Sequence, residues 1–464
     1  MNEQLHHDLL HLEAILEKAK EQGFSFLNQL DTRPTSTTNT VVSAPNLGEN
    51  GIGALEALRQ FHDRFDPIIV GSTGPRYWGF VTGGATPASI VGDWLSSVYD
   101  QNTQSLKGYG DISANIEMET ISLLLDLFEL PNTFLGGFVT GATMSNFSCL
   151  AVARQWLGNV LGKDIAKDGV DIKIPVLSAM PHSSAVKSLA MLGMGSKNIT
   201  IIKTMEGNRE AMDMLDLEHQ IQALEGQPFI LISSAGTVNT TDFDDFVAIQ
   251  HLKTKYQFWW HIDAAFGGFA VCSPEHKHQV QGWEGADSIT IDCHKWLNVP
   301  YDSAFYLIKE QHKMQQVATF QNSNAPYLGD PLEQFSYLNF LPENSRRLRA
   351  LPVWFTLCAY GKSGYRDIVE NSIAMAQLFG QFVEQSADFE LLAPVRLNNV
   401  CFTLKGLEKQ ELVSDFLGKL NTAGRVFMTP TVYKGKKGIR AAFVNWRTTK
   451  EDVQIAIEEV KRLV

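Results

Sequence analysis

The chain has 464 residues, enough for two or three domains and a large core, and its 44% hydrophobic and 19% charged residues are typical of a globular protein. A formal net charge of −12 argues against nucleic acid as a partner, because binding to phosphates needs a basic surface. Five cysteines without a CxxC pair predict a reduced cytoplasmic protein, and no apolar run is long enough to predict a membrane span.

The first predicted element is an amphipathic helix over residues 4–20. Its apolar residues recur at alternating spacings of four and three, which places them on one seam: Leu5, Leu9, Leu12, Leu16 and Ala19. Such a helix at a terminus needs a partner surface, either within the chain or on another subunit. A second helix is predicted over residues 54–65.

Glycines and aromatic residues crowd the following segment, 71–84. A loop of this composition either brings aromatic rings to a ligand or a neighbouring subunit, or is held by ordinary aromatic packing, and both interpretations stay open. Under the first, Tyr77, Trp78 and Phe80 are candidate contacts to a substrate with an aromatic or apolar side chain. A helix is predicted next, over residues 113–127, because its apolar residues share one face.

From residue 136 to residue 307, short apolar runs alternate with helical stretches. This alternation predicts an α/β fold in which a mostly parallel sheet of about seven strands is flanked by helices. The predicted strands are 137–140, 175–178, 199–202, 229–234, 258–262, 288–291 and 303–307. The last two are close enough in sequence to form an antiparallel hairpin.

The rest of the chain predicts a small α+β domain. Residues 310–345 have the composition of a loop, and a long helical region follows to about residue 386. Strands are predicted at 400–404, 424–430 and 439–445. The final helix begins at Thr449, whose spacing to Asp452 is that of a capping box.

Two of the predicted strands end in residues that carry chemistry. Asp263 follows the strand at 258–262, and Lys295 comes shortly after the strand at 288–291. Each has an ordinary explanation, as a helix cap or as a lysine that reaches back to water. In this order, however, they suit pyridoxal 5'-phosphate: a lysine holds its aldehyde as a Schiff base, and a carboxylate keeps its ring nitrogen protonated.

Two further segments offer the remaining groups that this cofactor needs. Gly141, Ala142 and Thr143 form a turn of small residues at a helix start, where bare backbone N–H groups bind phosphate. His182 opens another helix just after a strand, at the same edge of the predicted sheet. Each signal is weak alone, because Ser and Thr favour helix starts and a lone histidine is often structural.

In order and spacing, these motifs closely resemble the pyridoxal-phosphate-dependent amino-acid decarboxylases, the group that includes aromatic-L-amino-acid, tyrosine, histidine and glutamate decarboxylases. The resemblance covers nearly the whole chain and extends to Ala325-Pro-Tyr327-Leu and to residues 345–354. It implies the type I fold of pyridoxal-phosphate enzymes and a homodimer with active sites at its interface. It also implies an N-terminal helical dimerisation segment (1–80), a large cofactor-binding α/β domain (81–345) and a small C-terminal α+β domain (346–464).

The resemblance also implies a role for each site residue. Lys295 resembles the Schiff-base lysine, Asp263 the acid paired with the ring nitrogen, and His182 the histidine that stacks on the ring. Tyr327 matches a loop tyrosine that reprotonates the substrate carbon. The other implied cofactor contacts are Ala142, Thr143, Thr237 and His294.

Two positions depart from the family pattern. Asp292 stands where several members have an asparagine near the phosphate, and an ionised acid would repel that group. Val238 stands where the aromatic-type members have a threonine, which leaves the role of Thr237 open.

The predicted activity is therefore the decarboxylation of an L-amino acid to its amine and CO2. A carbon–carbon lyase or an aminotransferase on the same fold remains the alternative, because the lysine and the aspartate serve these reactions equally. The intact lysine, aspartate and histidine argue against a protein that only binds.

Two other classes are disfavoured. Gly361-Lys362-Ser363 resembles the end of a P-loop, but no strand precedes it and Thr356 replaces the first glycine, so a nucleotide site is not predicted. Cys293 and His294 have no further ligands at zinc spacing, so no metal site is predicted.

Overall fold

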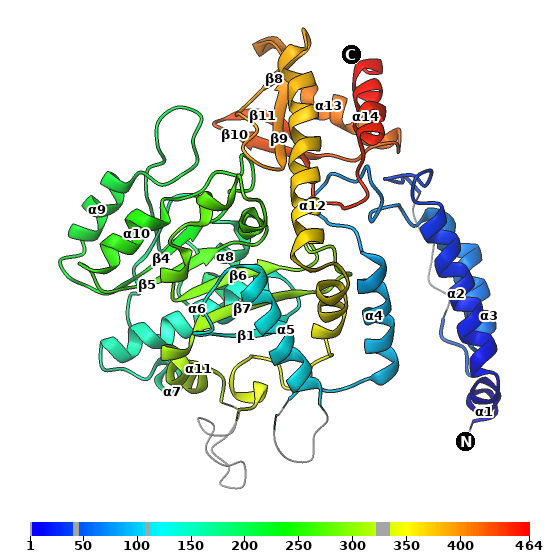
Figure 1. Cartoon of the computed structure of the whole chain (residues 1–464), viewed down its shortest axis with the longest axis horizontal. Helices are drawn as coiled ribbons and strands as arrows, with labels where there is room; N and C mark the ends of the chain where they lie inside the picture. Colours follow the sequence, from blue (N-terminus) through cyan, green and yellow to red (C-terminus); the bar gives the residue numbers. More distant parts are fainter. Residues whose placement is uncertain (1, 40–45, 105, 107–111, 322–334) are drawn as a thin grey trace.

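The structure, a computed structural model, describes residues 2–39, 46–104, 106, 112–321 and 335–464. Its centre is a seven-stranded sheet in the order β1-β7-β6-β5-β4-β2-β3, with helices on both faces (Figure 1). The strands are β1 (Phe134–Val139), β2 (Val176–Ser178), β3 (Ile199–Ile201), β4 (Phe229–Ser234), β5 (Phe258–Asp263), β6 (Ser288–Asp292) and β7 (Ala304–Lys309). Only β7 runs antiparallel to its neighbours, so the predicted mostly parallel sheet and the β6–β7 hairpin are confirmed.

The three central strands explain where a site can form. Every residue of β4, β5 and β6 is buried, as expected of strands that helices cover on both faces. In the strand register, Asp263 is paired with Ser234 on β4 and with Thr290 on β6. The carboxyl ends of these strands therefore lie level with one another, at the edge where open α/β sheets bind ligands.

Helices cover the sheet in two layers, each with its own hydrophobic core. One layer contains α6 (Ala142–Val160) and α8 (Ser183–Met191), and the other contains α5 (Ser113–Leu127), α10 (Phe246–Lys253) and the first part of α12 (Ala350–Gln385). The shorter helices at the rim are α7 (Ile165–Asp168), α9 (Met214–Gln222) and α11 (Lys313–Phe320).

The C-terminal part has a second sheet, four-stranded and antiparallel, in the order β10-β11-β9-β8. Helix α12 runs into it from the large sheet and contains one non-helical residue, Gly361, with φ of 56° (Figure 1). Thr449 and Asp452 form the predicted capping box at the start of α14. The elements are β8 (Phe389–Leu391), β9 (Asn399–Leu404), α13 (Val413–Thr422), β10 (Thr429–Tyr433), β11 (Lys436–Ala442) and α14 (Lys450–Arg462).

Some boundaries predicted in this part are wrong. The strand expected at 424–430 begins only at Thr429, because Gly424, with φ of 72°, follows the end of α13 and Phe427 forms only an isolated bridge to Tyr77. Strand β8 was not predicted, since three residues are too short for a periodic signal. The segment 345–349 precedes α12 rather than opening it.

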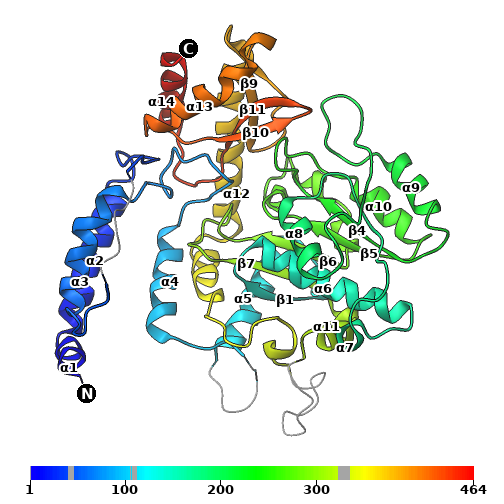
Figure 2. The same cartoon turned by 180° about the vertical axis from the view of Figure 1, so that it is seen from behind.

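The N-terminal helices form a layer of their own. Figures 1 and 2 show α2 (Leu12–Asn28) and α3 (Ala54–Arg64) side by side, with α1 (Glu3–Leu10) at the end of α2, and α4 (Pro87–Tyr99) lies between them and the sheet. The helix predicted over 4–20 is thus two helices that meet at His11.

The apolar seam predicted on these helices is exposed. Leu5 is 65% exposed and Leu16 is 53% exposed, so no surface of the described chain covers the seam. The predicted domain boundaries after residues 80 and 345 stay predictions. Among the described helices, none combines the length and apolar composition that crossing a membrane requires.

Candidate active site

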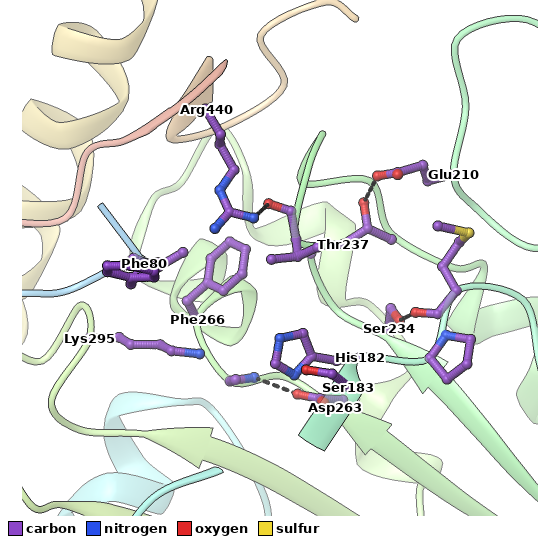
Figure 3. Close-up of a pocket in the computed structure, with 16 residues that line it drawn as sticks. Phe80, His182, Ser183, Glu210, Ser234, Thr237, Asp263, Phe266, Lys295 and Arg440 are labelled. Atoms are coloured by element: carbon purple, nitrogen blue, oxygen red, sulfur yellow. Dashed lines mark hydrogen bonds between the residues drawn. The ribbon is translucent and has the colours of Figure 1, made fainter. Parts of the chain in front are cut away.

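A cavity of about 470 Å³ opens at the carboxyl ends of β4 and β5, beside the turn that follows β6 (Figure 3). Its wall includes five of the predicted site residues: Phe80, His182, Thr237, Asp263 and Lys295. These residues come from separate regions of the sequence. The fold therefore brings together the amine, the carboxylate and the imidazole that the sequence motifs predicted.

Lys295 lies in the turn after β6, and its side chain is only 15% exposed. Its Nζ atom lies 3.0 Å from Oδ2 of Asp292, so the ammonium has a buried counter-ion. Gly83 packs against this turn and donates its N–H to the carbonyl of His294 (3.2 Å). In Figure 3 the side chain of Lys295 points into the cavity, toward Asp263 and His182.

Asp263 ends β5 and is 9% exposed. Its carboxylate accepts hydrogen bonds from Nδ2 of Asn146 (3.1 Å) and from the backbone N–H of Ala265 (3.3 Å). Among the described residues, no cationic side chain forms an ion pair with it, since the Lys295 ammonium pairs with Asp292. A largely buried carboxylate without a cation is suited to a ligand that brings a positive charge.

His182 is the N-cap residue of α8, and its ring is part of the cavity wall. Its Nδ1 atom lies 2.7 Å from Oγ of Ser184 and accepts the backbone N–H of Ser184 (3.3 Å). These contacts hold the ring beside Asp263, as Figure 3 shows. A flat ring fixed in this way can stack on a planar ligand.

Ala142 and Thr143 lie in the first turn of α6, and neither is among the residues that line the cavity. The N–H of Ala142 donates to Oδ1 of Asp292 at 2.6 Å. One of the backbone N–H groups that were predicted to bind phosphate is therefore already bonded to the Asp292 carboxylate. Asp292 thus contacts both the helix N-terminus and the Lys295 amine. The aspartate at position 292, where several members of the resembled family have an asparagine, therefore lies within the site itself.

Thr237 is on the cavity wall, but its hydroxyl forms a hydrogen bond with the carboxylate of Glu210. It donates to Oε2 of Glu210 at 2.6 Å, and Thr240 donates to the same oxygen at 2.7 Å. Glu210 is 3% exposed, so these bonds stabilise a buried carboxylate. Thr237 therefore positions Glu210 in this structure, and its part in holding a cofactor stays a prediction.

His294 lies outside the set of residues that line the cavity. Its ring stacks on Tyr301, with centroids 4.3 Å apart, and its Nε2 lies 3.5 Å from Oδ1 of Asp292. Burial lowers the pKa of this imidazole. His294 therefore adjoins Asp292 rather than the cavity itself.

The three aromatic candidates have different surroundings. Phe80 lies on the cavity wall, whereas Tyr77 stacks on Phe427 with ring centroids 4.6 Å apart. Trp78 is 1% exposed and packs against Phe443 in the core of the C-terminal part. The prediction that Trp78 contacts substrate is therefore corrected, since packing, the second interpretation of this loop, holds its side chain. The predicted substrate contact of Tyr77 stays a prediction.

Tyr327 lies outside the described residues, so its predicted role stays a prediction. Most of the other residues on the cavity wall were not predicted as site residues, among them Glu210, Phe266 and Arg440. Of these, Arg440 could have been identified from the sequence, because it is the single charged residue within the apolar strand predicted at 439–445.

Within the described part of the chain, no cluster of His, Cys, Asp or Glu could hold a metal ion.

Arg440 is 9% exposed and reaches the cavity from β11. Its Nη1 donates to the carbonyl of Val238 (3.0 Å), and its Nε has no hydrogen-bond partner among the described residues. No carboxylate of those residues forms an ion pair with it. The cavity therefore contains a guanidinium with unused donors.

Comparison with known proteins gives one family match. The model of the family described as "Pyridoxal-dependent decarboxylase conserved domain" matches residues 53–405. An aromatic-L-amino-acid decarboxylase of Bacillus atrophaeus is 28% identical over 94% of this chain and 92% of its own length. A phenylacetaldehyde synthase of a Rosa hybrid cultivar is 27% identical over 83% of this chain and 79% of its own length.

Solved structures share the fold. Catharanthus roseus tryptophan decarboxylase in complex with L-tryptophan superposes with a TM-score of 0.86 and 22% identity, covering 98% of both chains. Mouse CSAD superposes with a TM-score of 0.84 and 20% identity, covering 98% of this chain and 99% of its own. At such identities the likeness establishes the fold alone.

Proposed function

Because the chain belongs to the pyridoxal-dependent decarboxylase family, whose cofactor is pyridoxal 5'-phosphate, we propose that it decarboxylates an aromatic L-amino acid to its amine and CO2. The observation that carries this proposal is that Lys295 and Asp263 line one cavity from the ends of adjacent strands. The aromatic-L-amino-acid decarboxylase relative supports the choice of substrate class.

The groups on the cavity wall fit the cofactor. Asp263 is a buried carboxylate without a cationic partner among the described residues, which suits a protonated ring nitrogen. Lys295 offers an amine in a mostly buried site, and His182 offers a flat ring beside Asp263. We assign these three residues to the covalent attachment, the ring nitrogen and the ring face of the cofactor.

The chemistry divides between the cofactor and the protein. When bound, the cofactor supplies an electron sink for the negative charge that remains on the substrate carbon when CO2 leaves. Phe80 and Phe266 give the cavity apolar walls, and apolar surroundings disfavour an ionised carboxylate at the reacting carbon. We assign the delivery of a proton to that carbon to the Tyr327 hydroxyl.

The test is a product assay with purified protein, added cofactor and a panel of aromatic, acidic, basic and aliphatic L-amino acids. We expect CO2 and amine in equal amounts from an aromatic substrate. Aldehyde, keto acid or a carbon–carbon cleavage product in place of the amine would instead support a lyase, an aminotransferase or an aldehyde synthase. Lys295→Ala is the matched inactive control, because it removes the only group assigned to covalent attachment.

A second candidate substrate class is an acidic amino acid, and Arg440 favours it. A buried guanidinium with unused donors can bind a carboxylate in a bidentate manner. If the substrate is acidic, Arg440→Gln raises KM roughly 10–100-fold for it, the loss expected for a charged hydrogen-bond pair. If the substrate is aromatic, the same variant leaves the ranking of substrates unchanged.

We also propose that the protein is a homodimer. The exposed apolar seam on α1 and α2 supports this proposal, since contiguous exposed apolar surface marks an interaction site. Sedimentation of the wild-type protein and of a Leu5→Glu, Leu9→Glu variant tests it. We expect a dimer for the first and a shift toward monomer for the second, and a monomeric wild type would contradict the proposal.

We further propose a cytoplasmic location. Its support is that all five cysteines are free, as expected of a protein from a reducing compartment. Cell fractionation tests it, and recovery of the protein in an extracytoplasmic fraction would contradict it.

A further inference from the structure

Asn146 lies in the second turn of α6 and is completely buried. Its side-chain nitrogen donates two hydrogen bonds, one to Oδ2 of Asp263 (3.1 Å) and one to Oγ of Ser184 (3.0 Å). One amide group therefore contacts the cavity carboxylate and the residue that holds His182. Both donor hydrogens of the amide are used in these bonds.

The carboxylate of Asp263 determines which way this amide faces. An ionised carboxylate only accepts hydrogen bonds, so the nitrogen of Asn146 must face it, and Oδ1 must face the other way. There Oδ1 meets Nε2 of His261 at 2.7 Å. Because Oδ1 can only accept, Nε2 of His261 carries the hydrogen.

The other side of His261 is consistent with this assignment. Its Nδ1 atom lies 2.8 Å from Oγ of Ser288, and that oxygen accepts the indole N–H of Trp259 (2.9 Å). The hydroxyl hydrogen of Ser288 is thus free to donate to Nδ1. Donors and acceptors then alternate without conflict from Trp259 through Ser288, His261 and Asn146 to Asp263.

Burial keeps His261 in the neutral form that this chain of hydrogen bonds requires. The residue is 0% exposed, and burial lowers the pKa of its imidazole to about 4. At neutral pH the ring therefore has one N–H and one acceptor nitrogen. The neutral ring accepts from Ser288 and donates to Asn146, which no doubly protonated ring could do.

The second branch reaches His182. Ser184 accepts from Asn146 and lies 2.7 Å from Nδ1 of His182, so its own hydroxyl hydrogen donates to that nitrogen. This leaves the N–H of His182 on Nε2. The same amide therefore orients the two groups that we assign to the cofactor ring.

We propose that Asn146 is a positioning residue, which aims the Asp263 carboxylate at the ring nitrogen of the cofactor and sets the His182 ring, and that His261 fixes its amide. This inference rests on the proposed function, because it concerns the same cofactor. If the amide were reversed, its oxygen would face Asp263 and repel it. His261 prevents this reversal, since its Nε2–H requires an acceptor.

The test compares two cofactors in the cofactor-free protein. Dissociation constants are measured by absorbance titration for pyridoxal 5'-phosphate and for its analogue with a carbon in place of the ring nitrogen. Asn146→Ala is expected to weaken binding of the natural cofactor about tenfold or more, as for a lost hydrogen bond to a charged group, and to weaken the analogue far less. A merely structural role would weaken both equally.

The control variant is Asn398→Ala. Asn398 is equally buried, and its Nδ2 donates to the carbonyl of Phe443, in the C-terminal part. We expect it to leave the ratio of the two dissociation constants unchanged. An equal loss for both cofactors in Asn146→Ala, or no loss, would overturn the proposal.

Two further measurements keep the inference testable if Asn146→Ala fails to fold. Asn146→Asp has nearly the same shape but sets an acid against Asp263, and we expect it to lose the preference for the natural cofactor. In the wild type, 15N NMR of His261, assigned by its loss in His261→Gln, is expected to show the hydrogen on Nε2. A hydrogen on Nδ1 would overturn the inference, whereas a wild type that binds neither cofactor would refute the proposed function instead.

Discussion

Gly83 packs directly on the backbone of Lys295: a Cβ atom at position 83 would stand 1.9 Å from the Lys295 carbonyl oxygen. Alanine there forces the turn that carries the amine to move. We expect Gly83→Ala to lower the free energy of unfolding by about 3 kcal/mol or more and to weaken cofactor binding. Urea denaturation and absorbance titration measure the two effects.

The control for this prediction is Gly418→Ala. Gly418 lies in α13, and a Cβ atom added there would have nothing within 4 Å, so alanine is expected to stabilise by about 0.5–1 kcal/mol. If Gly83→Ala behaves like this control, Gly83 does not constrain the turn.

Asp292 should oppose the phosphate of the cofactor. Its carboxylate accepts the N–H of Ala142, at the helix start where the phosphate is expected. Asp292→Asn keeps the shape and removes the negative charge, so we expect the dissociation constant of the cofactor to fall about tenfold, given the strength of charge repulsion at short range. Titration of the cofactor-free protein measures it.

Asp213→Asn is the matched control for Asp292→Asn. Asp213 caps the N-terminus of α9, and asparagine caps equally well, so no change in cofactor affinity is expected. Weaker binding in Asp292→Asn would show instead that the ion pair with Lys295 outweighs the repulsion.

Trp78 should matter for stability rather than for substrate binding. It is buried against Phe379 and Phe443, and its indole N–H donates to the carbonyl of Pro75 (2.9 Å). We expect Trp78→Ala to cost about 3–5 kcal/mol of unfolding free energy. If its KM changes markedly while its stability is unchanged, the placement in the core is contradicted.

His261 should make stability depend on pH. Burial lowers the pKa of its imidazole in the folded protein from 6.5 to about 4, so between these values the unfolded chain binds a proton that the folded chain does not. The contribution of His261 to the free energy of unfolding is therefore fully present above pH 6.5. It is lost as the pH falls toward 4, and the loss amounts to about 3 kcal/mol.

The measurement is urea denaturation of wild type and His261→Gln at about pH 7 and about pH 4.5, where the linkage is large. We expect the wild type to lose more stability than the variant on going to the lower pH. Equal losses would mean that His261 takes up its proton over the same pH range in the folded protein as in the unfolded chain.

The central sheet was predictable because its strands are buried on both faces. Strands β4, β5 and β6 read as short apolar runs, and Asp263 and Lys295 stand just past two of them. Parallel strands bring such residues to one edge, so their meeting in one cavity follows from their order in the sequence. Strand β10 was misplaced because the apolar residues after Gly424 continue the strand pattern, although before Thr429 only Phe427 forms a bridge, and that bridge is to Tyr77.

The cavity walls were less predictable, because neighbouring residues with similar chemistry have different surroundings. Phe80 and Val81 both have positive φ, 56° and 58°, and this turn sends Phe80 to the cavity while Trp78 remains in the core. No local pattern distinguishes these aromatic residues. Arg440 reaches the cavity from a strand far along the chain, which only the tertiary packing reveals.

The pairing of Tyr77 with Phe427 anchors the Phe80 loop to the segment that leads into β10, and the sheet that contains β10 also supplies Arg440. During synthesis, a nascent chain that has not yet emerged past β11 has the amine and the carboxylate but lacks the part of the cavity wall that Arg440 supplies. We therefore expect chains truncated before β11 to retain vitamin B6 less well than the full chain, which would make cofactor retention a readout of complete synthesis.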